Sequence, residues 1–278
     1  MKLLENPSEC ITLAKLAVER LPHLKQVINA ADYRNWEERL ANESTEKYVL
    51  KHTPYNLLTA CVVSGLGIQY DFQDPGTKKA TSLINKLNYY LHCFPGLIVD
   101  KSFKGKIGNL DQSNLWSTLS ELSIAHYFQQ QGVAVSFEER FNNLSTKTTK
   151  DVDITLTDAN GCKVHLEVYT PSSDSTIDGF FAPDEENHHY AYKVGKKVLA
   201  KFGDQGFSGL SGKVIAAVNT VLLDQIQVQK LIGRLSIEKV YEEITAHLPQ
   251  GVDGLLQFSD DFGPAISLII EGLYLSKS

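Results

Sequence analysis

The first third of the chain repeats apolar residues at the three- and four-residue spacing of amphipathic helices. Ser8 is a suitable N-cap, and the apolar residues that follow it are Ile11, Leu13, Leu16, Ala17 and Leu24. The segments DYRNWEERLAN (32–42) and TKKATSLINKLNYYLHCF (77–94) continue the same spacing. This pattern predicts a helical N-terminal region whose first helix is capped by Ser8.

The helical pattern ends in the segment FPGLIVDKSFKGKIGNLDQSN (94–114), which mixes glycine, lysine and polar residues. Such a composition interrupts regular periodicity and is typical of a connection between structural units. We therefore expect a helical N-terminal region over residues 1–108 and a second domain over residues 109–278.

The second domain alternates between helical and strand patterns. Helical spacing covers residues 113–132, 185–205 and about 225–248, and strand patterns cover residues 133–141, a hairpin at 150–170, and residues 212–223, 254–258 and 265–275. The run GKVIAAVNTVLL is continuously apolar, which indicates a strand that is buried on both faces. Helices that alternate with strands predict an α/β domain with a mixed sheet.

The composition is that of a globular chain. Its 278 residues are 42% hydrophobic, and no apolar run approaches the roughly eighteen residues of a membrane span. The first ten residues, MKLLENPSEC, lack the pattern of a secretory signal peptide. The scattered cysteines contain no C-x-x-C motif and favour reduced thiols over a zinc site; they are Cys10, Cys61, Cys93 and Cys162. We expect a cytoplasmic protein with no membrane segment.

The net charge of −6 is unevenly distributed. Residues 1–110 carry 14 Lys and Arg against 11 Asp and Glu, a balance of +3, and the remaining residues carry 13 against 22, a balance of −9. One group of lysines in the first part has only Asp100 as a local counter-charge: Lys78, Lys79, Lys86, Lys101, Lys104 and Lys106. Such a cluster could contact the phosphates of a nucleic acid, or it could form an ordinary solvated surface.

Candidate chemistry gathers in the hairpin KDVDITLTDANGCKVHLEVYT, residues 150–170. Asp151 and Asp153 share one face of the first strand, because side chains two residues apart point the same way. A short turn at Asn160-Gly161 could place Asp153 roughly opposite Glu167 on the second strand. Two neighbouring carboxylates repel each other unless a proton or a cation lies between them. The pair therefore predicts a site for Mg²⁺ or Mn²⁺, which prefer oxygen ligands and need few from the protein.

This order of elements resembles the PD-(D/E)XK, or restriction-endonuclease-like, nuclease superfamily over residues 114–220. In this resemblance DVDI corresponds to the aspartate-bearing strand, HLEVYT to the (D/E)-X-K strand, and the helix with Glu121 to the first core helix. The resemblance implies that Asp153 and Glu167 bind the metal ion, with Asp151 and Glu121 as further supports. The implied activity is metal-dependent hydrolysis of phosphodiester bonds in DNA.

Two positions depart from the family pattern. Lys150, rather than proline, precedes the first aspartate, and Tyr169 occupies the lysine position. Tyrosine carries no positive charge at neutral pH, so it cannot do the electrostatic work of the lysine. Related families supply a lysine from the next helix, where Lys193, Lys197 and Lys201 recur at a spacing of four residues. Lys193 or Lys197 could take this catalytic role, or all three lysines could form the solvated face of that helix.

Two functions of different classes follow. The first is a divalent-metal-dependent DNA nuclease in restriction or another defence role, in which the cutting of both strands would favour a homodimer. The second is a nuclease-fold protein without catalysis, kept as a nucleic-acid-binding or protein-interaction module. Tyr169 and the acidic second part of the chain favour the second function, and fold resemblance alone does not decide between them.

Overall fold

A computed structural model of the chain describes residues 6–42, 56–108, 112–142, 149–170, 210–221, 248, 251–264 and 268–275. The chain divides into two compact units. The helical unit comprises Met1–Leu119 together with Phe262–Ile266, and the sheet unit comprises Ser120–Asp261 together with Ser267–Ser278. The sequence predicted a boundary between residues 108 and 109, whereas the two units divide inside a helix, between Leu119 and Ser120.

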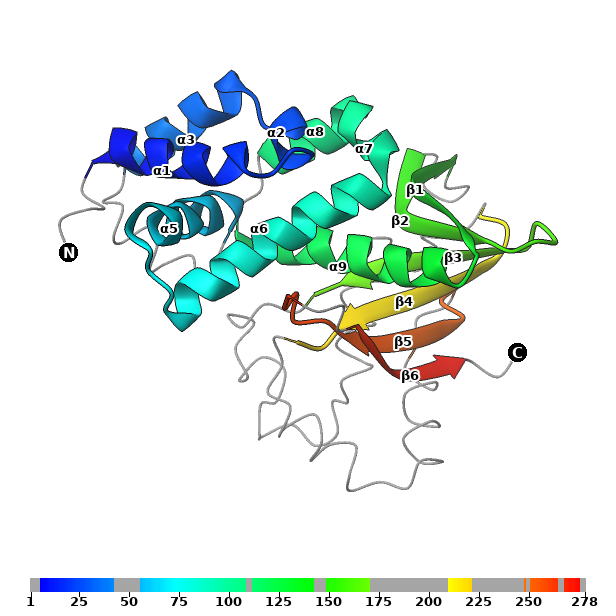
Figure 1. Ribbon diagram of the computed structural model, residues 1–278. Coiled ribbons are helices and arrows are strands. Elements are labelled where there is room, and N and C mark those ends of the chain that lie inside the picture. Colours follow the sequence, from blue (N-terminus) through cyan, green and yellow to red (C-terminus); the bar gives the residue numbers. More distant parts are fainter. Residues whose placement is uncertain are drawn as a thin grey trace, which may run out of the picture. The chain divides into compact units, whose positions relative to one another are not determined.

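The described part of the helical unit is built from helices alone (Figure 1). They are α1 (Pro7–Glu19), α2 (Leu24–Val27), α3 (Ala30–Asn42), α5 (Leu57–Tyr70), α6 (Pro75–Cys93), α7 (Pro95–Val99), α8 (Lys101–Gly108) and the first part of α9 (Gln112–Gln130). The expected helical region is therefore confirmed, and α3 and α6 correspond to the two later segments with helical spacing. No described helix is long and apolar enough to cross a membrane.

The start of α1 differs from the expectation that Ser8 is its cap. Asn6 is the N-cap, because its side-chain oxygen accepts a hydrogen bond from the backbone N–H of Ser8 at 3.0 Å. Pro7 follows as the first helical residue, where its missing N–H costs no hydrogen bond and its fixed φ suits a helix. Ser8 thus lies inside the first turn, and its hydroxyl donates to a carboxylate oxygen of Glu37 instead.

Helices α1 and α5 pack with their backbones in close approach. A Cβ atom placed on Gly65 of α5 would lie 2.2 Å from the carbonyl oxygen of Leu13 in α1, so only glycine fits at this contact. The side chain of Asn56 caps α5 by accepting from the N–H of Thr59, and Asp71 ends the helix in the left-handed conformation. Helix α5 is apolar on most sides and is buried along most of its length.

A short segment from the far end of the chain completes the helical unit. Phe262 is fully buried there, and its ring lies 5.4 Å from the ring of Trp116 between centroids. The hydroxyl of Ser82 in α6 donates a hydrogen bond to the carbonyl oxygen of Phe262. The core of the helical unit therefore contains a residue that is more than a hundred positions away in sequence from its neighbours.

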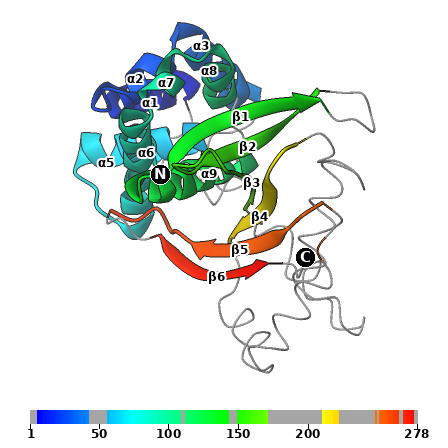
Figure 2. The ribbon, with the colours of Figure 1, turned by 90° about the vertical axis from the view of Figure 1, so that its right-hand side faces the viewer.

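The described residues of the sheet unit form a six-stranded mixed sheet in the order β1-β2-β3-β4-β5-β6 (Figure 2). The strands are β1 (Ala134–Asn142), β2 (Thr149–Thr157), β3 (Lys163–Tyr169), β4 (Lys213–Asn219), β5 (Gly254–Ser259) and β6 (Ile269–Leu275). Strands β1, β2 and β3 pair antiparallel, β3, β4 and β5 pair parallel, and β6 pairs antiparallel with β5. The expected α/β class with a mixed sheet is confirmed. The helix expected at 185–205, and that at 225–248 apart from Leu248, fall outside the described residues.

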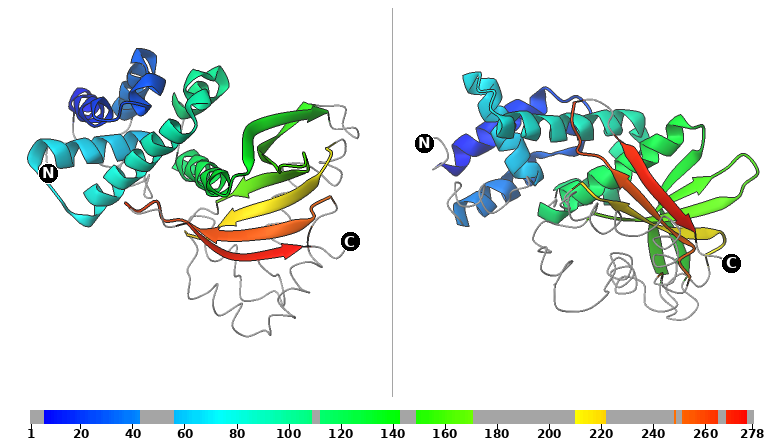
Figure 3. Two further views of the ribbon diagram at one scale, coloured as in Figure 1. Left: turned by 45° about the vertical axis from the view of Figure 1, so that its right-hand side comes forward. Right: turned by 90° about the horizontal axis from the view of Figure 1, so that it is seen from below.

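Helix α9 packs on one face of the sheet (Figure 3). The hydroxyl oxygen of Ser120 on α9 accepts hydrogen bonds from the Thr170 hydroxyl at 2.8 Å and from the Asn219 side-chain amide at 2.9 Å. The hydroxyl of Ser123 donates to the carboxylate of Asp260. All five of these side chains are buried. Because Thr170 directly follows β3 and Asn219 is the last residue of β4, these bonds identify the sheet face that α9 covers.

Candidate functional site

The turn of the central hairpin is defined by side-chain and backbone contacts. The carboxylate of Asp158 accepts from the backbone N–H groups of Asn160 and Cys162, each at 2.8 Å. Gly161 has a φ of +82°, a conformation that glycine adopts without strain. This turn sets the antiparallel register of β2 and β3, in which Ile154 lies opposite Leu166.

The register places Asp153 and Glu167 side by side. Thr155 pairs with His165, and their side chains are joined at 2.9 Å, so both point to the same face of the sheet. Asp153 lies two residues before Thr155, and Glu167 lies two residues after His165. Side chains two residues apart in a strand point the same way, so Asp153 and Glu167 share that face. A carboxylate oxygen of Asp153 also accepts from the backbone N–H of Val168 at 2.8 Å. Strands β2 and β3 pair antiparallel as the sequence predicted, and the metal-binding role of Asp153 and Glu167 stays a prediction.

The two carboxylates differ in their access to water. The side chain of Glu167 is 4% exposed, whereas Asp153 is half-buried. Asp151 lies on the same strand face as Asp153 but is exposed, and its backbone pairs with Arg140 of β1. A cation at Asp153 and Glu167 would thus lie at the boundary between a buried and an accessible carboxylate, while Asp151 lies towards the open end of the hairpin.

The role of Glu121 in this site stays a prediction. Glu121 belongs to α9, which packs on the face that carries Thr170. Side chains alternate along a strand, so Glu167 points to the opposite face from Thr170. Consistent with this, no group of three or more His, Cys, Asp or Glu side chains that could hold a metal ion occurs in the described parts of the chain.

The position of the family lysine holds a neutral side chain. Tyr169 lies two residues after Glu167 and shares its face of the sheet. It is half-buried, and this burial raises the pKa of its phenol above the ordinary value. The group stays protonated and uncharged at neutral pH and supplies no positive charge to the carboxylates. Lys193, Lys197 and Lys201 lie outside the described residues.

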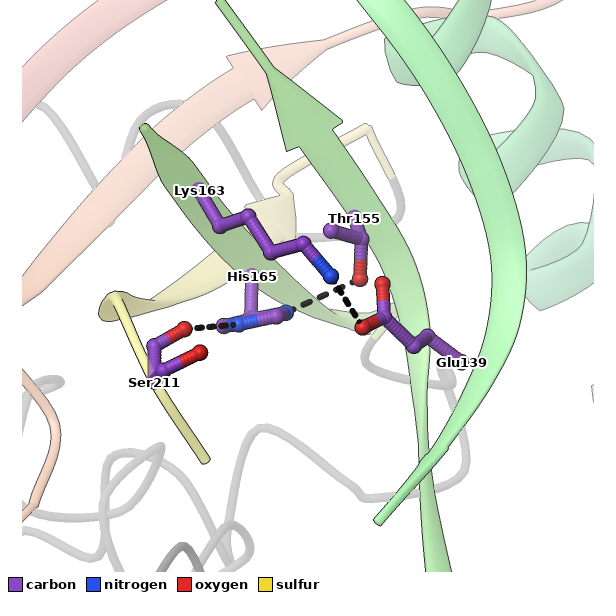
Figure 4. A network of polar contacts seen from close by, with 5 residues as sticks. All are labelled: Glu139, Thr155, Lys163, His165 and Ser211. Atoms are coloured by element: carbon purple, nitrogen blue, oxygen red, sulfur yellow. Dashed lines mark hydrogen bonds and ion pairs between the residues drawn. The ribbon is translucent and has the colours of Figure 1, made fainter. Parts of the chain in front are cut away.

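The same face of the sheet carries a polar network that the sequence did not reveal (Figure 4). The ammonium of Lys163 forms an ion pair with Glu139, and this hydrogen bond is the main cause that lowers the pKa of the Glu139 carboxyl. His165 bridges the Thr155 hydroxyl and the carbonyl oxygen of Ser211, each at 2.9 Å. Because a carbonyl only accepts, Nε2 of His165 donates to it, and Nδ1 of a neutral ring accepts from Thr155.

This network is structural in character. His165 is 1% exposed, and both of its ring nitrogens are engaged, so it has no nitrogen left to act as a base. The two bonds hold the His165 ring between β2 and the segment that precedes β4. Glu138, at a φ of +50°, lies between the regular pairs Phe137–Ile154 and Glu139–Val152, at the position opposite Asp153. No local sequence pattern signals the Glu139–Lys163 pair.

Comparison with known proteins finds no family model that matches the chain, and no significant match among curated proteins or solved structures.

Proposed function

We propose that the chain is a divalent-metal-dependent nuclease that hydrolyses DNA phosphodiester bonds. One observation carries the proposal, namely the side-by-side placement of Asp153 and Glu167 on adjacent strands. Two carboxylates at opposed positions of paired strands repel each other unless a proton or a cation lies between them. Mg²⁺ and Mn²⁺ bind oxygen ligands, and Mg²⁺ commonly takes only one or two carboxylates from the protein and keeps several waters.

The protein's part in the chemistry is to hold the two carboxylates in a fixed arrangement. The bond from the Val168 N–H restricts the Asp153 side chain, because a carboxylate held by a backbone donor has few alternative rotamers. Glu167 comes from the neighbouring strand and is buried, so its orientation is set by packing. A bound Mg²⁺ or Mn²⁺ would activate water and neutralise charge that develops on the phosphate.

The order of the elements supports the same proposal. A helix, α9, is followed by the antiparallel strands β1, β2 and β3, and β4 then pairs parallel with β3. This is the order on which the resemblance to the PD-(D/E)XK superfamily rests. The positive charge that Tyr169 does not supply is assigned in this proposal to Lys193 or Lys197. The restriction or defence role and the homodimer rest on the resemblance alone.

The second candidate function is a nuclease-fold module that binds nucleic acid or protein without catalysis. The neutral Tyr169 beside Glu167 favours it, because a metal site without a fixed positive charge stabilises a phosphoryl transition state less well. The two candidates make different predictions about metal. The nuclease requires an ion at Asp153 and Glu167, whereas the module requires none.

The experiment that separates them is a cleavage assay with a matched pair of variants. Plasmid and single-stranded DNA are incubated with the protein in Mg²⁺, in Mn²⁺ and in EDTA. We expect cleavage only with metal, and Glu167→Gln should abolish it while the far-UV circular dichroism spectrum stays unchanged. Glu38→Gln removes one exposed carboxylate from α3 of the helical unit and should leave the rate unchanged. The absence of both cleavage and calorimetric metal binding would favour the module.

A further inference from the structure

The helical unit contains a groove along α6 that the proposed catalytic site does not use. A cavity of about 500 Å³ is lined by residues of α5 and α6, together with Arg20 and Pro264. A second cavity of about 280 Å³ continues along α6 and shares Ser82, Asn85 and Pro264 with the first. We call the two together the α6 groove. All of its lining residues belong to the helical unit.

Three cationic side chains line the α6 groove together with neutral polar and apolar groups. Arg20 and Lys78 are exposed at the larger cavity, and Lys86 lines the smaller one. Asp71 is the one carboxylate among the lining residues of these two cavities. Within the described parts of the chain, neither the guanidinium of Arg20 nor the ammonium of Lys78 forms an ion pair or a side-chain hydrogen bond. These two cations are therefore available for an anionic ligand.

The remaining lining groups suit a sugar-phosphate backbone. Hydroxyl groups lie along the groove, and those of Ser64 and Thr81 are in contact at 2.9 Å. At the far end Tyr89 is 37% exposed, which leaves part of its ring accessible for stacking on a base. Lys78 and Tyr89 are separated by eleven residues of one helix, which corresponds to ~16 Å along its axis. The groove is thus long enough for more than one nucleotide.

We propose that the α6 groove binds a segment of single-stranded DNA, with Arg20 and Lys78 on its phosphates. This inference rests on the proposed function, because it names the form of the nucleic acid that the chain engages. Sites for single strands combine a positively charged groove that follows the backbone with aromatic side chains that stack on bases. A duplex is too wide to enter a concave space of about 500 Å³.

Some lysines of the basic cluster predicted from the sequence line the α6 groove, and others do not. Lys78 and Lys86 line it, whereas the ammonium of Lys79 lies over the ring of Trp116, 5.4 Å from the centroid. Lys101, Lys104 and Lys106 belong to α8 and are not among the lining residues. Contact with phosphates is therefore proposed for Lys78 of this cluster, together with Arg20, the C-cap residue of α1.

The test is a binding measurement that needs no catalysis. The full chain carrying Glu167→Gln is titrated in EDTA against a fluorescein-labelled twelve-nucleotide oligo-dT, and fluorescence anisotropy is followed at several salt concentrations. Adding Arg20→Gln and Lys78→Gln should weaken binding by roughly tenfold at about 100 mM salt. It should also reduce the magnitude of the salt slope by about 1.4, since each lost contact with a single strand contributes about 0.7.

Two further variants control for net charge. Lys25→Gln with Arg34→Gln removes the same number of charges from the helical unit outside the groove, and it should change the affinity by less than about twofold. Asn85→Trp leaves the charge unchanged and fills the groove at a residue that lines both cavities, so it should weaken binding. Each variant is checked by thermal unfolding before the titration.

Several results would overturn the assignment. Equal losses in the two charge variants, or unchanged binding by Asn85→Trp, would show that binding does not use the α6 groove. Binding of a duplex of the same length as tightly as the single strand would exclude the single-strand preference. Displacement of the oligonucleotide by adenosine monophosphate at similar concentration would identify a mononucleotide site instead. Intact binding without any metal-dependent cleavage would contradict the nuclease proposal and leave the α6 groove standing.

Discussion

Asp153 accepts a hydrogen bond from the backbone N–H of Val168, the residue that follows Glu167 on the neighbouring strand. The side chain of one proposed metal ligand is therefore attached to the backbone next to the other. This contact couples the hairpin's register to the separation of the two carboxylates. A change at Asp153 should consequently affect both the fold and the proposed chemistry, and suitable substitutions can separate the two effects.

Asp153→Asn should distinguish the negative charge of Asp153 from its hydrogen bond with the Val168 N–H. Asparagine keeps an oxygen that can accept from the Val168 N–H but removes the negative charge, so we expect a stability change below about 1 kcal/mol and a loss of Mn²⁺ binding. Asp153→Ala removes the acceptor as well and should cost about 1–3 kcal/mol. Urea unfolding and calorimetric titration with Mn²⁺ measure the two quantities. Unchanged Mn²⁺ affinity in Asp153→Asn would contradict the ligand role.

Tyr169→Lys tests where the positive charge comes from. If Lys193 or Lys197 supplies it, a second ammonium beside Glu167 should leave the cleavage rate unchanged or lower it. Tyr169→Phe is the matched control, because it keeps the ring and adds no charge. Single-turnover cleavage rates in Mg²⁺ compare the two variants. Activity that appears in Tyr169→Lys above an inactive parent would instead identify a module that lost catalysis through this position.

Lys163→Gln should reveal the ion pair with Glu139 through the pH dependence of stability. The pair lowers the pKa of Glu139, so its stabilisation is complete above the ordinary glutamate pKa and is lost as pH falls through the lowered value. The side chains are 37% and 31% exposed, which limits the effect at pH 7 to about 0.2–1 kcal/mol. Thermal melts at pH 7 and near pH 3 should show a difference that shrinks on acidification. A difference that grows at low pH would contradict this account.

Gly65→Ala should destabilise the helical unit by at least about 1–3 kcal/mol, because the added methyl group meets the Leu13 backbone. Gly105→Ala in α8 is a matched control, since a Cβ there meets no atom within 4 Å. It should stabilise the helix by about 0.5–1 kcal/mol. Hydrogen exchange of the described helices, read by mass spectrometry, measures the local effect of each change. Similar behaviour of the two variants would exclude a close α1–α5 contact.

Much of the fold was predictable because the signals are local. The helical spacing of Leu83, Leu87 and Leu91 predicts α6, and the Asn160-Gly161 turn predicts the β2–β3 hairpin that pairs Asp153 with Glu167. Helix α5 was not predicted, because its residues are apolar on most sides and show no stripe.

Helix α9 is buried over most of Leu115–His126, so its sequence does not indicate which side meets the sheet. Its orientation is set by Ser120 and Ser123, whose partners Thr170, Asn219 and Asp260 lie far along the chain. The Glu139–Lys163 pair likewise joins side chains that are 24 positions apart in the sequence, and no local pattern encodes it. Contacts made through distant partners were therefore the part that sequence reasoning could not supply.

The buried position of Phe262 in the helical unit has a consequence for how this protein is made. A ribosome releases the chain in order, so the helices of residues 7–119 emerge long before Phe262 is available to Ser82 and Trp116. Until that segment emerges, part of the helical core stays open to water. Native packing of the first-made unit is therefore a late event of synthesis, and truncation before residue 262 should leave even the N-terminal helices prone to aggregation.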